Sequence, residues 1–158
     1  MDDTVLMRIE ASPPRRVFAL VVLLSLAFLL VYLGMKGAGQ PLVVQAFLVV
    51  LALGALYLAQ RLWRATGEAI ELVAGGLRTG GGEWIAEMDE IERLDRGTFA
   101  FKPSNGFIVI LLTSRPARWR PGMWWRLGRR VGVGGVTSAG QSKAMAEIIA
   151  ARIAAREG

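Results

Sequence analysis

Apolar residues gather in two long runs in the first half of the chain. Residues 17–35 contain no charged side chain, and residues 42–62 contain one, Arg61, in what would be the last helical turn. A helix rises about 1.5 Å per residue, so each run is long enough to cross a hydrocarbon core about 30 Å thick. The pattern predicts two membrane-spanning helices, and Arg61 can extend its charge toward the lipid headgroups.

The two runs are joined by residues 36–41, a connection rich in glycine that ends at Pro41. So short a connection predicts antiparallel neighbours, and therefore a transmembrane hairpin over residues 17–62. Five arginines flank the opposite end of this hairpin: Arg8, Arg15, Arg16, Arg61 and Arg64. Because positive residues are retained on the cytoplasmic side, we expect both termini to be cytoplasmic and residues 1–16 to form a cytoplasmic tail.

Two other interpretations of the apolar runs are less consistent with the sequence. A cleaved signal peptide would not be followed at once by a second long apolar run. Two buried core helices would need a larger soluble domain to cover them. Small residues in the second run, Ala52, Gly54, Ala55 and Ala59, either pack the hairpin against itself or bind a partner helix, and we favour the former.

The remainder of the chain, residues 65–158, shows mainly the alternation expected of strands. Strand patterns cover residues 69–74, 77–79, 98–102, 107–113 and 130–133, and residues 103–106 form a turn pattern. The period then changes, because apolar residues recur at three- and four-residue steps over residues 139–156, which predicts a C-terminal helix. Ser138 and Gln141 have the spacing of a capping box. The prediction is an α+β domain, an antiparallel sheet or partly open barrel capped by a helix.

Two shorter segments need separate interpretation. Residues 83–94 combine the three-residue spacing of a helical turn, at Met88, Ile91 and Leu94, with a position that suits a continuing strand. The glycines within residues 75–82 are not a phosphate-binding loop, because Glu83 stands where that motif needs lysine. We expect them to form two tight turns around one short strand.

The order of these segments resembles a known family. Two N-terminal spans, the sequence EWIAEMDEIERL at 83–94, a hairpin, WWRLGRRVGVGGVT at 124–137 and a C-terminal amphipathic helix are similar to bacterial two-helix membrane proteins with a pleckstrin-homology-like (PH-like) domain. The resemblance implies a curved sheet of about seven strands capped by a helix. It also implies a binding or assembly module, since no enzymatic activity is common to the family.

Composition sharpens this picture by exclusion. The chain is 53% hydrophobic and 20% charged, which excludes a disordered polar chain. It contains neither cysteine nor histidine, so it lacks thiolate metal ligands and the side chain most used for proton transfer near neutral pH. We therefore predict a protein that is not an enzyme and that holds no cofactor or metal. Its net charge of +6 is consistent with contact to an anionic surface.

The most distinctive stretch is residues 115–130, RPARWRPGMWWRLGRR, which we expect to be a loop that contacts the membrane or a partner. The candidate contact residues are Arg115, Arg118, Trp119, Arg120, Trp124, Trp125, Arg126, Arg129 and Arg130. Tryptophan prefers the headgroup layer, and arginine is attracted to anionic lipid. Two alternatives are a structural segment whose tryptophans fill the core and, least favoured, a nucleic-acid surface.

An acidic segment at residues 83–95 is the electrostatic counterpart of this stretch. Its spacing does not match the twelve-residue calcium loop. We favour a solvated strand edge or a partner for the arginines over a Ca²⁺ or Mg²⁺ site.

Together these patterns predict a non-enzymatic protein of the bacterial inner membrane. Its PH-like cytoplasmic domain would bind the membrane surface, through anionic lipid headgroups, or a membrane protein. The alternative is an accessory or assembly subunit of a respiratory, photosynthetic or transport complex. No nucleic-acid partner is expected, and a homo-oligomer stays open.

Overall fold

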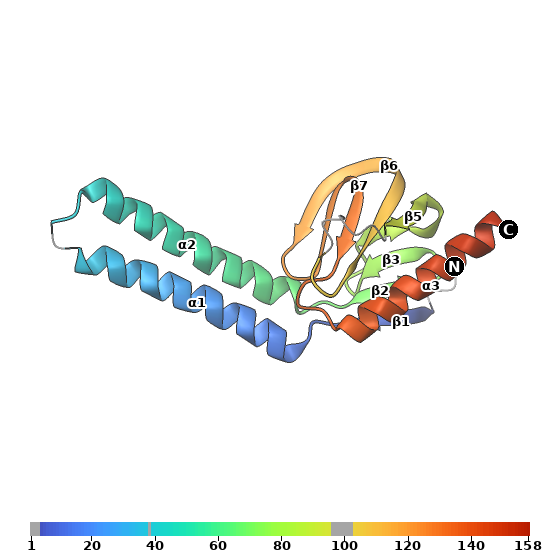
Figure 1. Cartoon of the computed structure of the whole chain (residues 1–158), viewed down its shortest axis with the longest axis horizontal. Coiled ribbons are helices and arrows are strands. Elements are labelled where there is room, and N and C mark those ends of the chain that lie inside the picture. Colours follow the sequence, from blue (N-terminus) through green and yellow to red (C-terminus); the bar gives the residue numbers. More distant parts are fainter. Residues whose placement is uncertain (1–3, 38, 96–102) are drawn as a thin grey trace.

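The computed structural model describes residues 4–37, 39–95 and 103–158 of the chain. A long two-helix hairpin, α1 (Pro13–Lys36) and α2 (Leu42–Ala65), projects from one end of a domain built of strands and one further helix (Figure 1). This arrangement confirms the predicted helical hairpin joined to an α+β domain.

Both hairpin helices are longer than their apolar runs because they continue into the soluble domain. Helix α1 begins at Pro13, where proline suits the first helical turn, and α2 ends three residues beyond the predicted 62. Within the described residues, these two helices are long and apolar enough to cross a membrane, and most of their large side chains are exposed. The alternative interpretation, that the two apolar runs are buried core helices, is therefore wrong.

Small residues hold the hairpin together. Ala52, Ala55 and Ala59 are spaced by three and four residues, so they share one face of α2, and all three are buried along with Ala27 of α1. Gly54 faces open space instead. The three alanines thus serve the packing of the hairpin itself, as favoured from the sequence.

The chain contains no cysteine, so a designed disulfide tests this packing cleanly. A Cβ atom placed on Gly34 of α1 would lie 3.9 Å from the Leu48 Cβ of α2, inside the usual disulfide range of about 3.5–4.5 Å. We expect the pair Gly34→Cys and Leu48→Cys to form an intramolecular disulfide on mild oxidation, measured by mass spectrometry. The pair Gly34→Cys and Gly54→Cys, with Gly54 facing outward, is the control. Equal cross-linking of both pairs would contradict the packing.

The soluble domain contains two antiparallel sheets. The first has the order β1 (Val5–Ile9), β2 (Ile70–Val73), β3 (Gly76–Thr79) and β4 (Trp84–Glu87). The second has the order β5 (Ile91–Asp95), β6 (Phe107–Arg120) and β7 (Trp124–Val133). Helix α3 (Ala139–Glu157) packs against β1, β5 and β6. One core joins both sheets to α3; it includes Ile9, Leu72, Leu77, Leu111, Val131, Met145 and Ile149.

The prediction that residues 1–16 form a tail is wrong. Strand β1 lies within them and pairs with β2, so the hairpin is an insertion between two neighbouring strands of one sheet (Figure 1). Ile9 is completely buried in the core. Arg8 forms an ion pair of 3.3 Å with Glu71 across β1 and β2, which also ties the strand to the domain.

The strands inside the soluble domain agree with the sequence patterns in part. Strands β2 and β3 lie within or next to 69–74 and 77–79, and β6 begins at 107 as expected but continues to Arg120. Strand β7 includes 130–133 but starts at Trp124. The strand predicted at 98–102 falls outside the described residues, while β6 itself pairs with β5 and β7.

The ambiguous segment contains both kinds of structure. Strand β4 is followed by a single 3-10 turn, η1 (Met88–Glu90), and then by β5. The glycine-rich segment forms turns on either side of β3, with positive φ at Gly76 and Gly82, as expected.

Helix α3 starts where it was predicted, but the predicted capping box does not form. Ser138 makes no capping bond through its side chain. The Gln141 Oε1 atom instead accepts a hydrogen bond of 3.1 Å from the backbone N–H of Glu10, which links α3 to the segment that follows β1.

Candidate functional site

The segment expected to be a loop, residues 115–130, is a β-hairpin. Strand β6 runs to Arg120, a turn follows at 121–123, and β7 begins at Trp124. Trp119 pairs with Trp125 and Arg120 with Trp124 across the two strands. Gly122 has a φ of +76° in the turn, a conformation that glycine adopts without strain. We call residues 115–130 the arginine–tryptophan ribbon.

Alternation of side chains gives this ribbon two chemically different faces. Arg118, Arg120, Trp124 and Arg126 share one face, which we call the inner face, and Ala117, Trp119, Trp125 and Leu127 share the opposite, outer face. On the inner face, Trp124 is only 2% exposed and fills the core. On the outer face, Trp119 is 53% exposed and Leu127 is 68% exposed. The large exposed apolar side chains of the ribbon therefore lie on its outer face.

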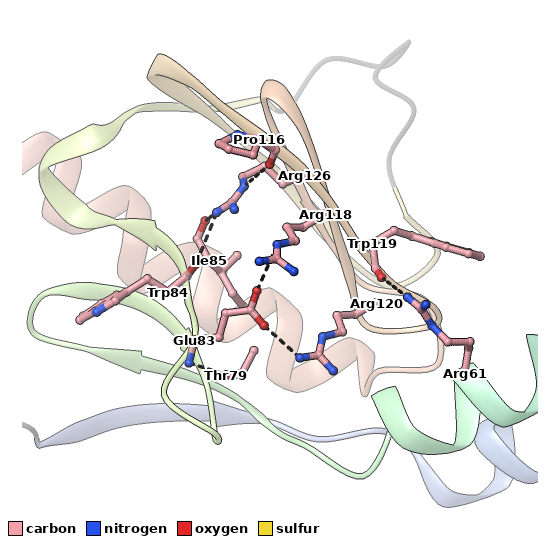
Figure 2. Close-up of polar contacts among 10 residues, drawn as sticks. All are labelled: Arg61, Thr79, Glu83, Trp84, Ile85, Pro116, Arg118, Trp119, Arg120 and Arg126. Carbon is pink, nitrogen blue, oxygen red and sulfur yellow. Dashed lines mark hydrogen bonds and ion pairs between the residues drawn. The ribbon is translucent and has the colours of Figure 1, made fainter.

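Arg126 on the inner face is a structural residue. It is 7% exposed, and its guanidinium donates to the carbonyl oxygens of Pro116 at 3.0 Å and Ile85 at 2.9 Å (Figure 2). Burial lowers the pKa of Arg126 from its usual value. The contact with Ile85 connects the ribbon to β4 of the other sheet. Arg126 and Trp124 are thus buried and cannot contact a surface as the sequence suggested.

Glu83 is the acidic partner of two ribbon arginines. Its carboxylate lies 2.9 Å from Arg120 Nη2 and 3.7 Å from Arg118 Nε (Figure 2). Its backbone N–H also donates to Thr79 Oγ1, which holds the start of β4 in place.

The other glutamates of the acidic segment have the same role further along the ribbon. Arg115 Nη2 lies 2.6 Å from Glu90 and 3.0 Å from Glu87, and these hydrogen bonds raise the pKa of Arg115. Arg129 pairs with Glu92. The interpretation of the acidic segment as a partner for the arginines is confirmed for these residues. In the described part of the chain, this segment included, no group of three or more acidic side chains is placed to hold a metal.

The tip of the ribbon rests against the end of α2. The Arg61 guanidinium donates to the Trp119 carbonyl at 3.3 Å (Figure 2). It also donates to the Tyr57 hydroxyl at 3.0 Å. A Cβ atom on Gly122 would come within 2.6 Å of Leu62 Cδ1, so the turn approaches α2 closely. The exposed Trp119 is therefore held beside the last turns of the apolar helix.

Aromatic and basic side chains also meet at the end of α1 nearest the domain. The Arg16 guanidinium lies 4.0 Å from the centre of the Trp63 ring, and it donates to the Trp63 carbonyl at 3.2 Å. Arg15 donates to the Thr137 carbonyl at 2.9 Å. Arg16 thereby joins α1 to the end of α2, and Arg15 attaches α1 to the rest of the domain.

A groove opens between the ribbon and α2. It encloses about 390 Å³ and is lined by Arg61, Arg64, Ala65, Ala117, Arg118, Trp119, Arg120 and Pro121. Four of these residues are arginines from two separate elements, and none is acidic. The two arginines of α2 were assigned from the sequence only to the membrane boundary, because nothing in their spacing indicates that the ribbon folds onto them.

The nine predicted contact residues therefore divide into groups. Arg115, Arg118, Arg120 and Arg129 are paired with glutamates, and Trp124 and Arg126 are buried. Trp119 also lines the groove beside α2, and Trp125 lies opposite it on β7. Arg130 is exposed but lies opposite Ile110, far along β6 from the ribbon tip.

Sequence reasoning missed Leu127, although its alternation with Trp125 would have placed both on one face.

Comparison with known proteins adds no assignment to this geometry. No family model, no curated protein and no solved structure matches this chain.

Proposed function

We propose that this protein is a non-enzymatic integral membrane protein of the bacterial inner membrane. In this proposal α1 and α2 span the bilayer, and a PH-like domain lies on the cytoplasmic surface and contacts it through the outer face of the ribbon. The observation that carries the proposal is the position of the exposed Trp119, bonded through its carbonyl to Arg61 at the end of an exposed apolar helix.

The exposed surface of the hairpin supports the membrane assignment. Both helices satisfy their own backbone hydrogen bonds, as a lipid environment requires, and present large apolar side chains outward. Arginine and tryptophan occur at the end near the domain, including Arg16 and Trp63. At the other end Lys36 lies 5.2 Å from the Tyr32 ring. Polar and aromatic residues at both ends are typical of membrane boundaries.

The topology supports both the orientation and the PH-like assignment. Strand β1 precedes the hairpin and α3 ends the described chain, and both belong to one domain, so a spanning hairpin leaves them on the same side of the bilayer. The arginine excess at that end favours the cytoplasm. A four-stranded and a three-stranded sheet capped by a C-terminal helix agree with the architecture that the family resemblance implies.

Spin labels in the reconstituted full-length protein test the surface contact. Because the chain contains no cysteine, single cysteines can be introduced for labelling as Trp119→Cys and Leu127→Cys. The control is Leu112→Cys, at another exposed position, on β6. We expect labels at 119 and 127 to be more accessible to oxygen than to a water-soluble nickel reagent in anionic vesicles. The label at 112 should show the reverse preference.

Two results would contradict the proposal. Equal nickel accessibility at all three positions would place the ribbon in water. The labels at 119 and 127 could instead be protected from the nickel reagent in native membranes but not in pure lipid vesicles. That result would assign the outer face to a protein partner, as expected for a subunit of a larger complex.

A further inference from the structure

The groove between the ribbon and α2 has the features of an anion site. Arg61 and Arg64 are three residues apart in the last turns of α2, so they lie on neighbouring positions of one helix side. Arg118 and Arg120 are two residues apart on β6 and point to the same face. The fold thus places four arginines along one groove from positions more than fifty residues apart in sequence, and the guanidinium groups of Arg118 and Arg120 turn toward Glu83 (Figure 2).

The charge of these four arginines is only partly neutralised within the protein. Glu83 pairs with Arg118 and Arg120, while Arg61 donates only to neutral oxygens, those of Tyr57 and Trp119. The Arg64 side chain is exposed and makes no hydrogen bond or ion pair in the described part of the chain. One carboxylate among four cations leaves the groove strongly positive, with several N–H donors available.

The guanidinium groups of Arg61 and Arg64 are suited to the oxygens of a phosphate. Their planar N–H pairs bond phosphate in a bidentate manner, and the groove volume of about 390 Å³ is that of a small-ligand site. Tyr57, Arg61 and Trp119 lie together at the same end of α2, which is where lipid headgroups lie if the helix spans a bilayer.

We propose that this groove binds the phosphate of an anionic phospholipid, with Arg64 and Arg61 as its principal donors. The inference rests on the proposed membrane function and names the ligand of the same surface. A lipid phosphate, rather than free phosphate, suits a groove that is open beside the outer surface of α2 and bordered by the apolar Trp119. Bound there, the headgroup would join the domain to the bilayer at a defined orientation.

The test is native mass spectrometry of the full-length protein in detergent micelles, titrated with phosphatidylglycerol or phosphatidylcholine. We expect one phosphatidylglycerol to be retained in preference to phosphatidylcholine. Arg64→Gln should weaken its retention about threefold and Arg64→Glu about tenfold, since a charge-assisted contact is lost and then replaced by repulsion. Arg130→Gln and Arg130→Glu, at a second exposed arginine without a partner among the described residues, should leave retention within about twofold.

Three outcomes would overturn the inference. If the Arg64 variants retained the lipid as the wild type does, the groove would not be the lipid-binding site. An equal loss in the Arg130 variants would show that only overall charge matters. Displacement of the lipid by an equal concentration of inorganic phosphate would show that the ligand is the free anion. None of these outcomes depends on the spin-label accessibility at Trp119, so the surface contact can fail or hold independently of the groove.

Discussion

Replacement of Arg126 by methionine is expected to lower the free energy of unfolding of the soluble domain by about 2–4 kcal/mol. The variant removes a nearly buried guanidinium whose hydrogen bonds reach the carbonyls of Pro116, Ile85 and, at 3.4 Å, Trp84. Methionine keeps much of the side-chain volume but cannot donate, so these carbonyls lose their partner in the interior. Because the contacts join the ribbon to β4, the loss also weakens the junction of the two sheets.

Arg130→Met is the matched control for this prediction. It removes the same charge from the same strand at an exposed position, and we expect a change within about 0.5 kcal/mol. Urea unfolding of the full chain in mild detergent, followed by tryptophan fluorescence, measures both variants. Equal stability of the two variants would show that Arg126 is not needed to join the sheets.

The difference between these two arginines illustrates what the sequence could predict. The dense run of arginine and tryptophan correctly identified the ribbon as unusual, but composition cannot distinguish a buried arginine from an exposed one. That distinction depends on β4, which brings the Ile85 carbonyl to Arg126 from 41 residues away. Arg130 faces no comparable partner in the described residues.

The hairpin helices were more predictable because their signal is local. A continuous apolar run predicts a long apolar helix without reference to the rest of the fold, and both runs lie inside α1 and α2. The capping box failed for the opposite reason. Gln141 has the right spacing from Ser138, but its carbonyl oxygen bonds to Glu10, which a local pattern could not show.

The anion groove could not be predicted for a related reason. Its two halves are the last turns of α2, where arginines follow the apolar run, and the end of β6, whose arginines pair with glutamate. Only the close approach of the turn at Gly122 to Leu62 places them together.

We expect strand β1 to be essential for the stability of the soluble domain. Its five residues precede a long helix and carry little periodic signal, yet they pair with a strand that begins sixty residues later, after the hairpin. Residues 66–158 therefore do not form a complete domain, and an experiment on the domain must include β1. We expect Ile9→Asp in the full chain to prevent stable folding of the soluble domain, with a loss above about 4 kcal/mol.

The reason for so large an effect is the position of Ile9. Its side chain is completely buried in the core with Leu72 and Leu77, so aspartate would place a charge there without a partner. Leu6→Asp is the control, since Leu6 is exposed on the same strand. Limited proteolysis of the full chain in detergent should cleave the soluble domain rapidly in Ile9→Asp and slowly in Leu6→Asp. If both variants resisted cleavage as the wild type does, β1 would not be an integral strand of the sheet, and the hairpin would be an N-terminal anchor rather than an insertion.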